Sequence, residues 1–140
     1  MMSPVTAYLM FNGTCAEAMR FYERTLGGKL GMMMTAKDSP VADKLPPGSG
    51  DRILHARLDV GGGALMASDW MAPQPYEGMK GFSLALSYPT VAEGKRVFDA
   101  LAAGGQVNMP FEKTFWVESF GMCVDRYGTA WMVNGGKPSV

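Results

Sequence analysis

Few side chains in this 140-residue sequence could carry out chemistry near neutral pH, and His55 is the only histidine. An imidazole can act as a general acid or base in that range. Arg57 lies two residues further on, so in a strand it would share a face with His55 and could steady an anionic substrate. The alternative is a strand histidine whose ring is satisfied by its neighbours. His55 is the candidate catalytic residue and Arg57 a candidate ligand-binding residue.

Two aspartates stand where strands are expected to end. Asp69 could accept a hydrogen bond from a substrate, although capping the linker that follows it is the favoured interpretation. Asp125 precedes a tight turn, where an aspartate commonly accepts hydrogen bonds from the turn backbone. A structural role is therefore the favoured prediction for both.

An aromatic pair and a thiol complete the candidates for a binding cleft. The segment Thr114-Phe115-Trp116 offers an aromatic wall with a hydroxyl, suited to a planar or apolar ligand. Core packing or a dimer contact would explain the same residues. Cys123 is a further candidate for the cleft, but no basic neighbour in sequence suggests an activated thiolate. With only Cys15 as the other cysteine, a disulfide framework is excluded and reduced thiols are expected.

The sequence repeats itself, and the repeat indicates the elements that position these residues. The segment from Thr14 to Glu23 returns 76 residues later, where Thr14, Ala16, Glu17 and Arg20 recur as Thr90, Ala92, Glu93 and Arg96. Thr-x-x-Glu is a capping box, so both copies predict a helix start. Each expected helix has one apolar stripe and ends at a glycine pair. A second echo relates 58–66 to 124–132 and predicts two hairpins.

Each copy therefore reads strand, helix, strand, then hairpin. Module 1 covers about 5–69, a linker 70–80 follows, and module 2 covers about 81–134, all within a single domain 1–140. The expected strands are 5–11, 29–36, 53–60, 63–69, 81–87, 106–112, 119–125 and 129–134. The proline- and glycine-rich segment 37–52 is extra in the first copy, and a mobile surface loop is expected there.

Alternation along each strand predicts which face meets a helix. Leu54, Ala56, Leu58 and Val60 form one such apolar face, as do Phe120, Met122 and Val124, and Leu84, Leu86 and Tyr88. The opposite faces would line a shared interior if the two copies curl around each other. That interior would combine the ligand-binding candidates Arg57, Met66, Ser68, Ser83, Met132 and Asn134 with His55.

Composition excludes several classes of partner. Thirteen Lys and Arg balance thirteen Asp and Glu, so neither a nucleic-acid groove nor a membrane surface is expected. No signal peptide or membrane span is expected, and a cytoplasmic location fits the reduced thiols. No G-x-G-x-x-G motif is present, and Gly61-Gly62-Gly63 falls in an expected hairpin without a following helix. This pattern does not favour a methyltransferase that binds S-adenosylmethionine.

The doubled order of elements resembles the vicinal-oxygen-chelate superfamily of glyoxalases, bleomycin-resistance proteins and extradiol dioxygenases, and more narrowly its PhnB-like branch. The segments that carry the resemblance are Tyr8–Gly13, Phe21-Tyr22 with Leu26–Gly28, Ile53–Ala56, Leu65–Asp69, Thr114–Trp116, Phe120-Gly121 and Asp125–Gly128 leading to Trp131–Asn134. One departure is Val117, where the family usually has glycine. The resemblance implies an α+β fold of two tandem βαβββ modules whose curved mixed sheets surround a cleft.

The resemblance also bears on metals and partners. Metal-using relatives supply a His or Gln from the first strand of each module and a Glu from the last, and these positions align with Ala7, Met66, Ser83 and Met132. A slip of one residue would bring in Tyr8, Ala67 or Trp131. None of these is a good ligand for a metal that prefers imidazole and carboxylate. We therefore expect no metal and no cofactor, an unknown small molecule as ligand, and a homodimer; a glyoxalase- or dioxygenase-like enzyme and a drug-sequestering resistance protein are the alternatives.

Overall fold

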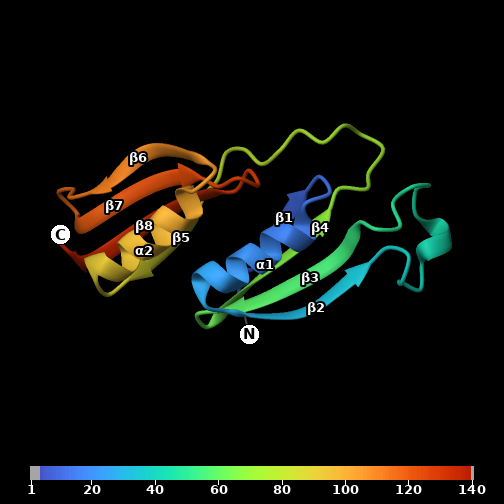
Figure 1. Cartoon of the computed structure of the whole chain (residues 1–140), viewed down its shortest axis with the longest axis horizontal. Coiled ribbons are helices and arrows are strands. Elements are labelled where there is room, and N and C mark those ends of the chain that lie inside the picture. The colour runs from blue at the N-terminus through green and yellow to red at the C-terminus, as the bar shows by residue number, and fades with distance from the viewer. Residues whose placement is uncertain (1–3, 140) are drawn as a thin grey trace. The chain divides into compact units, whose positions relative to one another are not determined.

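A computed structural model describes residues 4–139 and contains two compact units, which divide between Gly78 and Met79. Each unit has four strands and one long helix in the order strand, helix, then three strands (Figure 1). The prediction of two βαβββ modules in tandem is confirmed.

The first unit contains strands β1 (Ala7–Phe11), β2 (Lys29–Thr35), β3 (Ile53–Val60) and β4 (Gly63–Asp69), with helix α1 (Cys15–Leu26). The strand order is β1-β4-β3-β2. Strand β1 runs parallel to β4, whereas the other two pairs are antiparallel, so the sheet is mixed. Helix α1 lies against one face of this sheet and leaves the other face uncovered by any helix of its unit (Figure 1).

The second unit repeats this topology. Its strands are β5 (Leu84–Tyr88), β6 (Gln106–Glu112), β7 (Val117–Val124) and β8 (Ala130–Pro138), in the order β5-β8-β7-β6, with helix α2 (Val91–Ala102) packed on one face. The parallel pair is again the first strand with the last. Strand β8 continues four residues beyond its expected end: Gly135 pairs with Ser119 and, after a register shift, Pro138 pairs with Val117.

A buried core lies between each helix and its sheet. In the first unit Leu9, Phe11, Met19, Tyr22 and Leu58 are completely buried. In the second unit the corresponding core side chains are Val97, Phe98, Leu101, Trp131 and Val133. Apolar burial of this kind is the main source of stability for such a small unit.

The two helices begin differently although their sequences repeat. Thr90 accepts a hydrogen bond from the N–H of Glu93 at 3.1 Å, as the capping box predicts. Thr14 makes no side-chain cap. The carboxylate of Asp69 replaces it and accepts the N–H groups of Gly13 and Cys15 at 2.8 and 3.0 Å. The capping box predicted for the first helix is therefore wrong.

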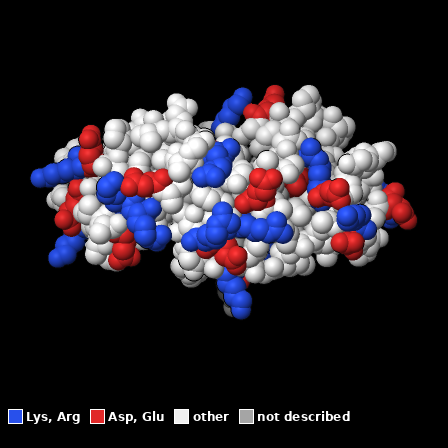
Figure 2. Space-filling model, in the orientation of Figure 1, with Lys and Arg blue, Asp and Glu red and all other residues white. Residues whose placement is uncertain are grey.

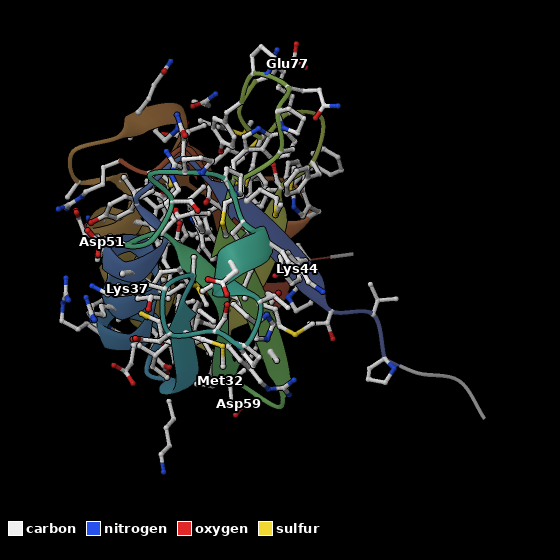
Figure 3. The ribbon with its side chains drawn as sticks, turned by 90° about the vertical axis from the view of Figure 1, so that its right-hand side faces the viewer. Met32, Lys37, Lys44, Asp51, Asp59 and Glu77 are labelled. Carbon is white, nitrogen blue, oxygen red and sulfur yellow. The ribbon has the colours of Figure 1, made fainter. Side chains whose placement is uncertain are left out.

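The segment between β2 and β3 is folded into turns and a short 3-10 helix, η1 (Ala42–Lys44). Its ends are joined by backbone hydrogen bonds from Ala36 to Arg52 and from Lys37 to Gly50. Figure 3 shows Lys37 and Asp51 close together at the base of this segment, and their side chains form an ion pair of 2.9 Å. A mobile surface loop is the prediction for this segment. In the structure the segment leaves the sheet, and its turns are closed by backbone hydrogen bonds.

Candidate functional site

Four of the residues predicted from sequence lie on the open face of the first sheet, opposite α1. The register pairs Arg57 with Met66 across β3 and β4, and Met66 with Tyr8 across β4 and β1. Since Ala56 pairs with Ala67, alternation places His55 and Ser68 on the same face as Arg57 and Met66. The structure thus brings His55, Arg57, Met66 and Ser68 together, and adds Tyr8 and Met10.

Tyr8 is the chemical partner of His55. Its hydroxyl lies 3.3 Å from Nδ1 of His55, and the two ring centroids are 5.9 Å apart. A distance of 3.3 Å is at the long end for a hydrogen bond. From the sequence, Tyr8 is a candidate only if the alignment with metal ligands is shifted by one residue. The signal that could have found it is the alternation of β1, in which Leu9 and Phe11 enter the core and Tyr8 cannot.

Arg57 is already engaged in the structure. Its Nε lies 3.0 Å from Oδ1 of Asp59, and both side chains are at least half exposed. An exposed pair of this kind stabilises a protein little, and a competing anion in solution can replace it. The Nη donors of Arg57 therefore remain for an anionic ligand, which would compete with Asp59 for the charge.

The register changes the residues opposite Met66 and Met132 from those expected, one in each unit. Ala7 pairs with Leu65 in the ladder, so it lies on the helix-facing side of the sheet. Tyr8 is the residue opposite Met66 on the open face. In the second unit the residue opposite Met132 is Ala85, two positions from the expected Ser83 and on the same side of the chain. Within residues 4–139, no three His, Cys, Asp or Glu side chains group closely enough to hold a metal ion.

The open face of the second sheet contains a pocket of about 420 Å³. It is lined by Trp116 and Asn134, both predicted from sequence, together with Ser87, Val117, Gly136 and Pro138. Met132 lies on the same face because it precedes Asn134 by two residues in β8. The carboxamide of Asn134 donates to the carbonyl of Leu86 at 3.4 Å, which leaves most of its hydrogen-bonding capacity for a ligand.

The ring of Trp116 lines this pocket, and two further aromatic rings pack against it. The ring of Trp116 packs edge-on against Phe115 on one side and Phe120 on the other, with centroids 4.9 and 5.2 Å apart. The tight turn between Thr114 and Val117 holds the segment in place. Phe115 itself is 79% exposed and does not line the pocket. Of the predicted aromatic wall, Trp116 faces the pocket and Phe115 supports it.

Cys123 does not lie on this open face, so its predicted place in the cleft is wrong. A Cβ added to Gly121 would meet the ring of Phe98 on α2, and Cys123 follows Gly121 by two residues. The face of β7 that meets the helix is therefore the one with small residues, and Phe120 and Met122 lie on the open side. Burial raises the pKa of the Cys123 thiol to about 11, with a smaller contribution from Asp125. This is the opposite of an activated thiolate.

The two candidate aspartates are structural. Asp69 is 3% exposed, and besides capping α1 it accepts the N–H of Ile53 at 2.8 Å. Its contacts are therefore with the helix start and β3, and the predicted cap of the linker is wrong. Asp125 accepts the backbone N–H groups of Tyr127 and Thr129 and the indole N–H of Trp131. Its predicted role in the turn is confirmed.

Charge on the surface gives no single-sign region on the face drawn in Figure 2, where acidic and basic side chains are interspersed. This agrees with the thirteen basic and thirteen acidic residues of the chain. No helix among residues 4–139 has the length and apolar character needed to cross a bilayer.

Comparison with known proteins places the chain in a family. The model of the 3-demethylubiquinone-9 3-methyltransferase family matches residues 3–134. Protein YjdN of Escherichia coli is 39% identical, with 94% of each chain covered. Protein PA1353 from Pseudomonas aeruginosa is 50% identical, with a TM-score of 0.89 over 96% of this chain and 98% of that one. A PhnB protein from Bacillus cereus is 26% identical, with a TM-score of 0.79 over 94% and 98%.

More distant structures share the fold. A glyoxylase/bleomycin resistance protein/dioxygenase domain from Frankia, 16% identical, has a TM-score of 0.60 over 96% of this chain and 97% of that domain. The matched family, the doubled topology and the resemblance carried by the sequence motifs agree. The chain belongs to the 3-demethylubiquinone-9 3-methyltransferase family, a PhnB-like family with the glyoxalase/bleomycin resistance/dioxygenase fold.

Proposed function

We propose that this chain binds a small aromatic or apolar molecule on the open faces of its sheets, without a resident metal ion. The observation that carries the proposal is the pocket of about 420 Å³ beside Trp116 and Asn134. Its volume falls in the range of roughly 300–1,000 Å³ typical of small-molecule sites. An indole wall with one carboxamide suits a flat ligand that carries a single polar group.

The residues at the family's ligand positions support binding without a metal. The resemblance aligns them with Ala7, Met66, Ser83 and Met132, and the residues paired with Met66 and Met132 on the open faces are Tyr8 and Ala85. A methyl group cannot bind a metal, and a thioether is a soft ligand unsuited to the divalent ions that prefer imidazole and carboxylate. The phenol of Tyr8 would be a single oxygen ligand, and its hydroxyl already contacts Nδ1 of His55.

Methyl transfer, which the family description names, has less support in this chain. Gly61 and Gly62 form the turn between β3 and β4, where both have positive φ values of 55° and 82°. The chain continues into a strand after this turn. A glycine-rich loop that binds a nucleotide-like cofactor would instead lead into a helix N-terminus.

A titration with 2-naphthol, a flat aromatic with one hydroxyl, tests the proposal. We expect saturable shifts of the Trp116 indole and Asn134 carboxamide resonances, because both side chains line the pocket. In Trp116→Ala the shift of the Asn134 carboxamide should be lost, with the circular dichroism spectrum retained. Val41→Ala, at an exposed position of the other unit that lines neither this pocket nor the pocket beside Arg52, is the control and should bind normally. Binding unchanged in Trp116→Ala would return Trp116 to a purely structural role.

An acid–base enzyme is the second candidate, and the Tyr8–His55 contact of 3.3 Å favours it. In this reading His55 moves a proton and Arg57 leaves Asp59 to hold an anionic substrate. Turnover of a bound metabolite, abolished in His55→Gln and retained in Val41→Ala, would establish the enzyme over the binder.

A resistance-type protein that sequesters an aromatic compound is a third candidate. For all three candidates we propose that the chain forms a homodimer. Large apolar side chains are exposed on the second unit at Val107, Met109 and Phe115. Exposed apolar groups of this kind often mark interfaces. Sedimentation equilibrium should give twice the chain mass, and Phe115→Asp should shift the protein toward monomer; a monomer at all concentrations would refute the dimer.

A further inference from the structure

A second pocket lies in the first unit, away from the open face of its sheet. It has a volume of about 360 Å³ and lies between the turn at Pro46–Ser49 and the segment that begins at Trp70. Three prolines, Pro46, Pro47 and Pro73, line it together with Trp70, Met71 and Arg52. Prolines restrict the backbone, so the walls of this pocket are stiffer than an ordinary loop.

The charge in this pocket comes from Arg52. Its guanidinium donates to the carbonyl of Trp70 at 2.8 Å and to Oδ1 of Asn12 at 3.0 Å. Both acceptors are neutral, and none of the ion pairs found within residues 4–139 includes Arg52. A guanidinium has five N–H donors in a planar fork, so donors remain for a further acceptor.

Two acidic residues lie near Arg52, Asp51 in sequence and Asp69 across the sheet, and both are bonded to other groups. Asp51 pairs with Lys37 at 2.9 Å. Asp69 accepts three backbone N–H groups, those of Gly13, Cys15 and Ile53. The positive charge of Arg52 is thus held in place by neutral oxygens beside an apolar wall.

The aromatic wall is also fixed. The indole N–H of Trp70 donates to the carbonyl of Gln74 at 2.7 Å, and the ring packs edge-on against Tyr76 with centroids 5.9 Å apart. The hydroxyl of Tyr76 in turn donates to the carbonyl of Met10 at 2.6 Å. On the opposite side, Ser49 is buried and bonds back to the carbonyl of Pro46.

From this arrangement we propose that the Arg52 pocket is a binding site for a small organic carboxylate with an apolar ring. The guanidinium meets the carboxylate, and the ring lies between the prolines and Trp70. Guanidinium–carboxylate hydrogen bonds are charge-assisted and often bidentate, which gives both strength and orientation. This site is separate from the Trp116 pocket and does not depend on the function proposed for it.

The test uses benzoate as the probe and benzamide, its neutral isostere, as the control, on the full chain labelled with ¹⁵N. The indole N–H of Trp70 is identified by its loss in Trp70→Phe. Benzoate should shift this resonance and the amide of Gly48 saturably, and should bind at least about tenfold more tightly than benzamide because its hydrogen bonds to Arg52 are charge-assisted. Equal shifts from the two compounds, or shifts confined to Trp116, would overturn the proposal.

Substitutions at Ala72, an exposed residue of the pocket lining, complete the test while keeping Arg52 and its acceptors Asn12 and Trp70 in the chain. Ala72→Glu places a competing carboxylate at the pocket, whereas Ala72→Gln has the same size and no charge. We expect Ala72→Glu to weaken benzoate binding by about fivefold or more relative to Ala72→Gln, with no difference for benzamide. Equal benzoate affinity in the two variants would contradict the site. The dispersion of the amide resonances in the same spectra shows whether each variant is folded.

Discussion

The hydroxyl of Tyr8 lies 3.3 Å from Nδ1 of His55, which joins β1 and β3 across β4 on the open face of the first sheet. The only histidine of the chain is therefore oriented by a phenol rather than by a carboxylate. In a neutral imidazole one nitrogen donates and the other accepts, whereas a phenol can do either. A phenol O–H is the stronger donor of the two groups, so we expect the contact to favour the tautomer in which Nδ1 accepts.

Removing the Tyr8 hydroxyl should change this selection. With the phenol donating to Nδ1, the proton of neutral His55 resides on Nε2, and Tyr8→Phe should lower that fraction. Long-range ¹H–¹⁵N spectra measure it directly, because a single histidine gives a single set of signals. Met10→Leu, on the same face of β1, is the control. Identical spectra for Tyr8→Phe and the parent would show that the contact does not orient His55.

The two repeated threonines should differ in their effect on stability. Thr90→Ala removes the N-terminal cap of α2, in which Thr90 accepts the N–H of Glu93, and should lower the free energy of unfolding by about 1 kcal/mol. Thr14→Ala should cost much less, because Asp69 caps α1 in place of Thr14. Urea denaturation of both variants measures the difference. Equal losses would mean that Thr14 caps its helix in solution.

Gly121 should not tolerate a side chain. A Cβ at this position would lie 2.6 Å from the Phe98 ring and 3.0 Å from the backbone of Phe111. Gly121→Ala should therefore lower stability by about 1–3 kcal/mol, the usual cost of overpacking. Gly31→Ala, whose Cβ would meet only the Arg57 carbonyl at 3.7 Å, is the matched control. If both variants melt at the parental temperature, the assignment of this face of β7 to the helix is wrong.

Neither cysteine should react with a thiol reagent in the folded protein near neutral pH. Burial raises the pKa of Cys15 to about 12, with a further contribution from Asp69, and that of Cys123 to about 11. Because the folded state holds these protons more tightly than the unfolded chain, the stability they contribute is complete below about pH 9 and is lost as the pH rises through 11 and 12.

Reaction with a disulfide reagent at about pH 8 should therefore be slow until denaturant exposes both thiols. Ser139→Cys, at an exposed position, provides a fast-reacting reference. Rapid labelling of Cys123 in the native protein would place that thiol at the surface and return it to the open face.

Alternation and repeats predicted the elements well where a strand has one apolar and one polar face. His55, Arg57, Met66 and Ser68 were grouped correctly because Ala56 and Leu58 on the opposite side of β3 are plainly core residues. The same reasoning failed for β7. There the helix-facing side has Ser119, Gly121 and Cys123, because the aromatic rings of Phe98 and Phe111 fill the space and leave room only for small residues.

Residues that depend on contacts between distant segments could not be found from spacing. Asp69 caps a helix that begins 54 residues earlier in the chain, and no local sequence pattern indicates that role. The Arg52 pocket likewise needs two segments that the sequence marked only as an insertion and a linker. The place of Tyr8 on the open face could have been predicted, because the apolar residues Leu9 and Phe11 occupy the other face of β1.

The central claim is that the chain binds its ligand without a metal, and the metal content of untagged protein tests it most directly. Elemental analysis should find less than stoichiometric metal, and calorimetric titration with Zn²⁺, Ni²⁺, Mn²⁺ and Fe²⁺ should give no saturable heat. We expect these results because the residues that the resemblance aligns with metal ligands, Ala7, Met66, Ser83 and Met132, and the open-face partners Tyr8 and Ala85 include no imidazole or carboxylate. A tightly held metal in a one-to-one ratio would contradict the account and restore a glyoxalase- or dioxygenase-like enzyme whose ligands lie elsewhere.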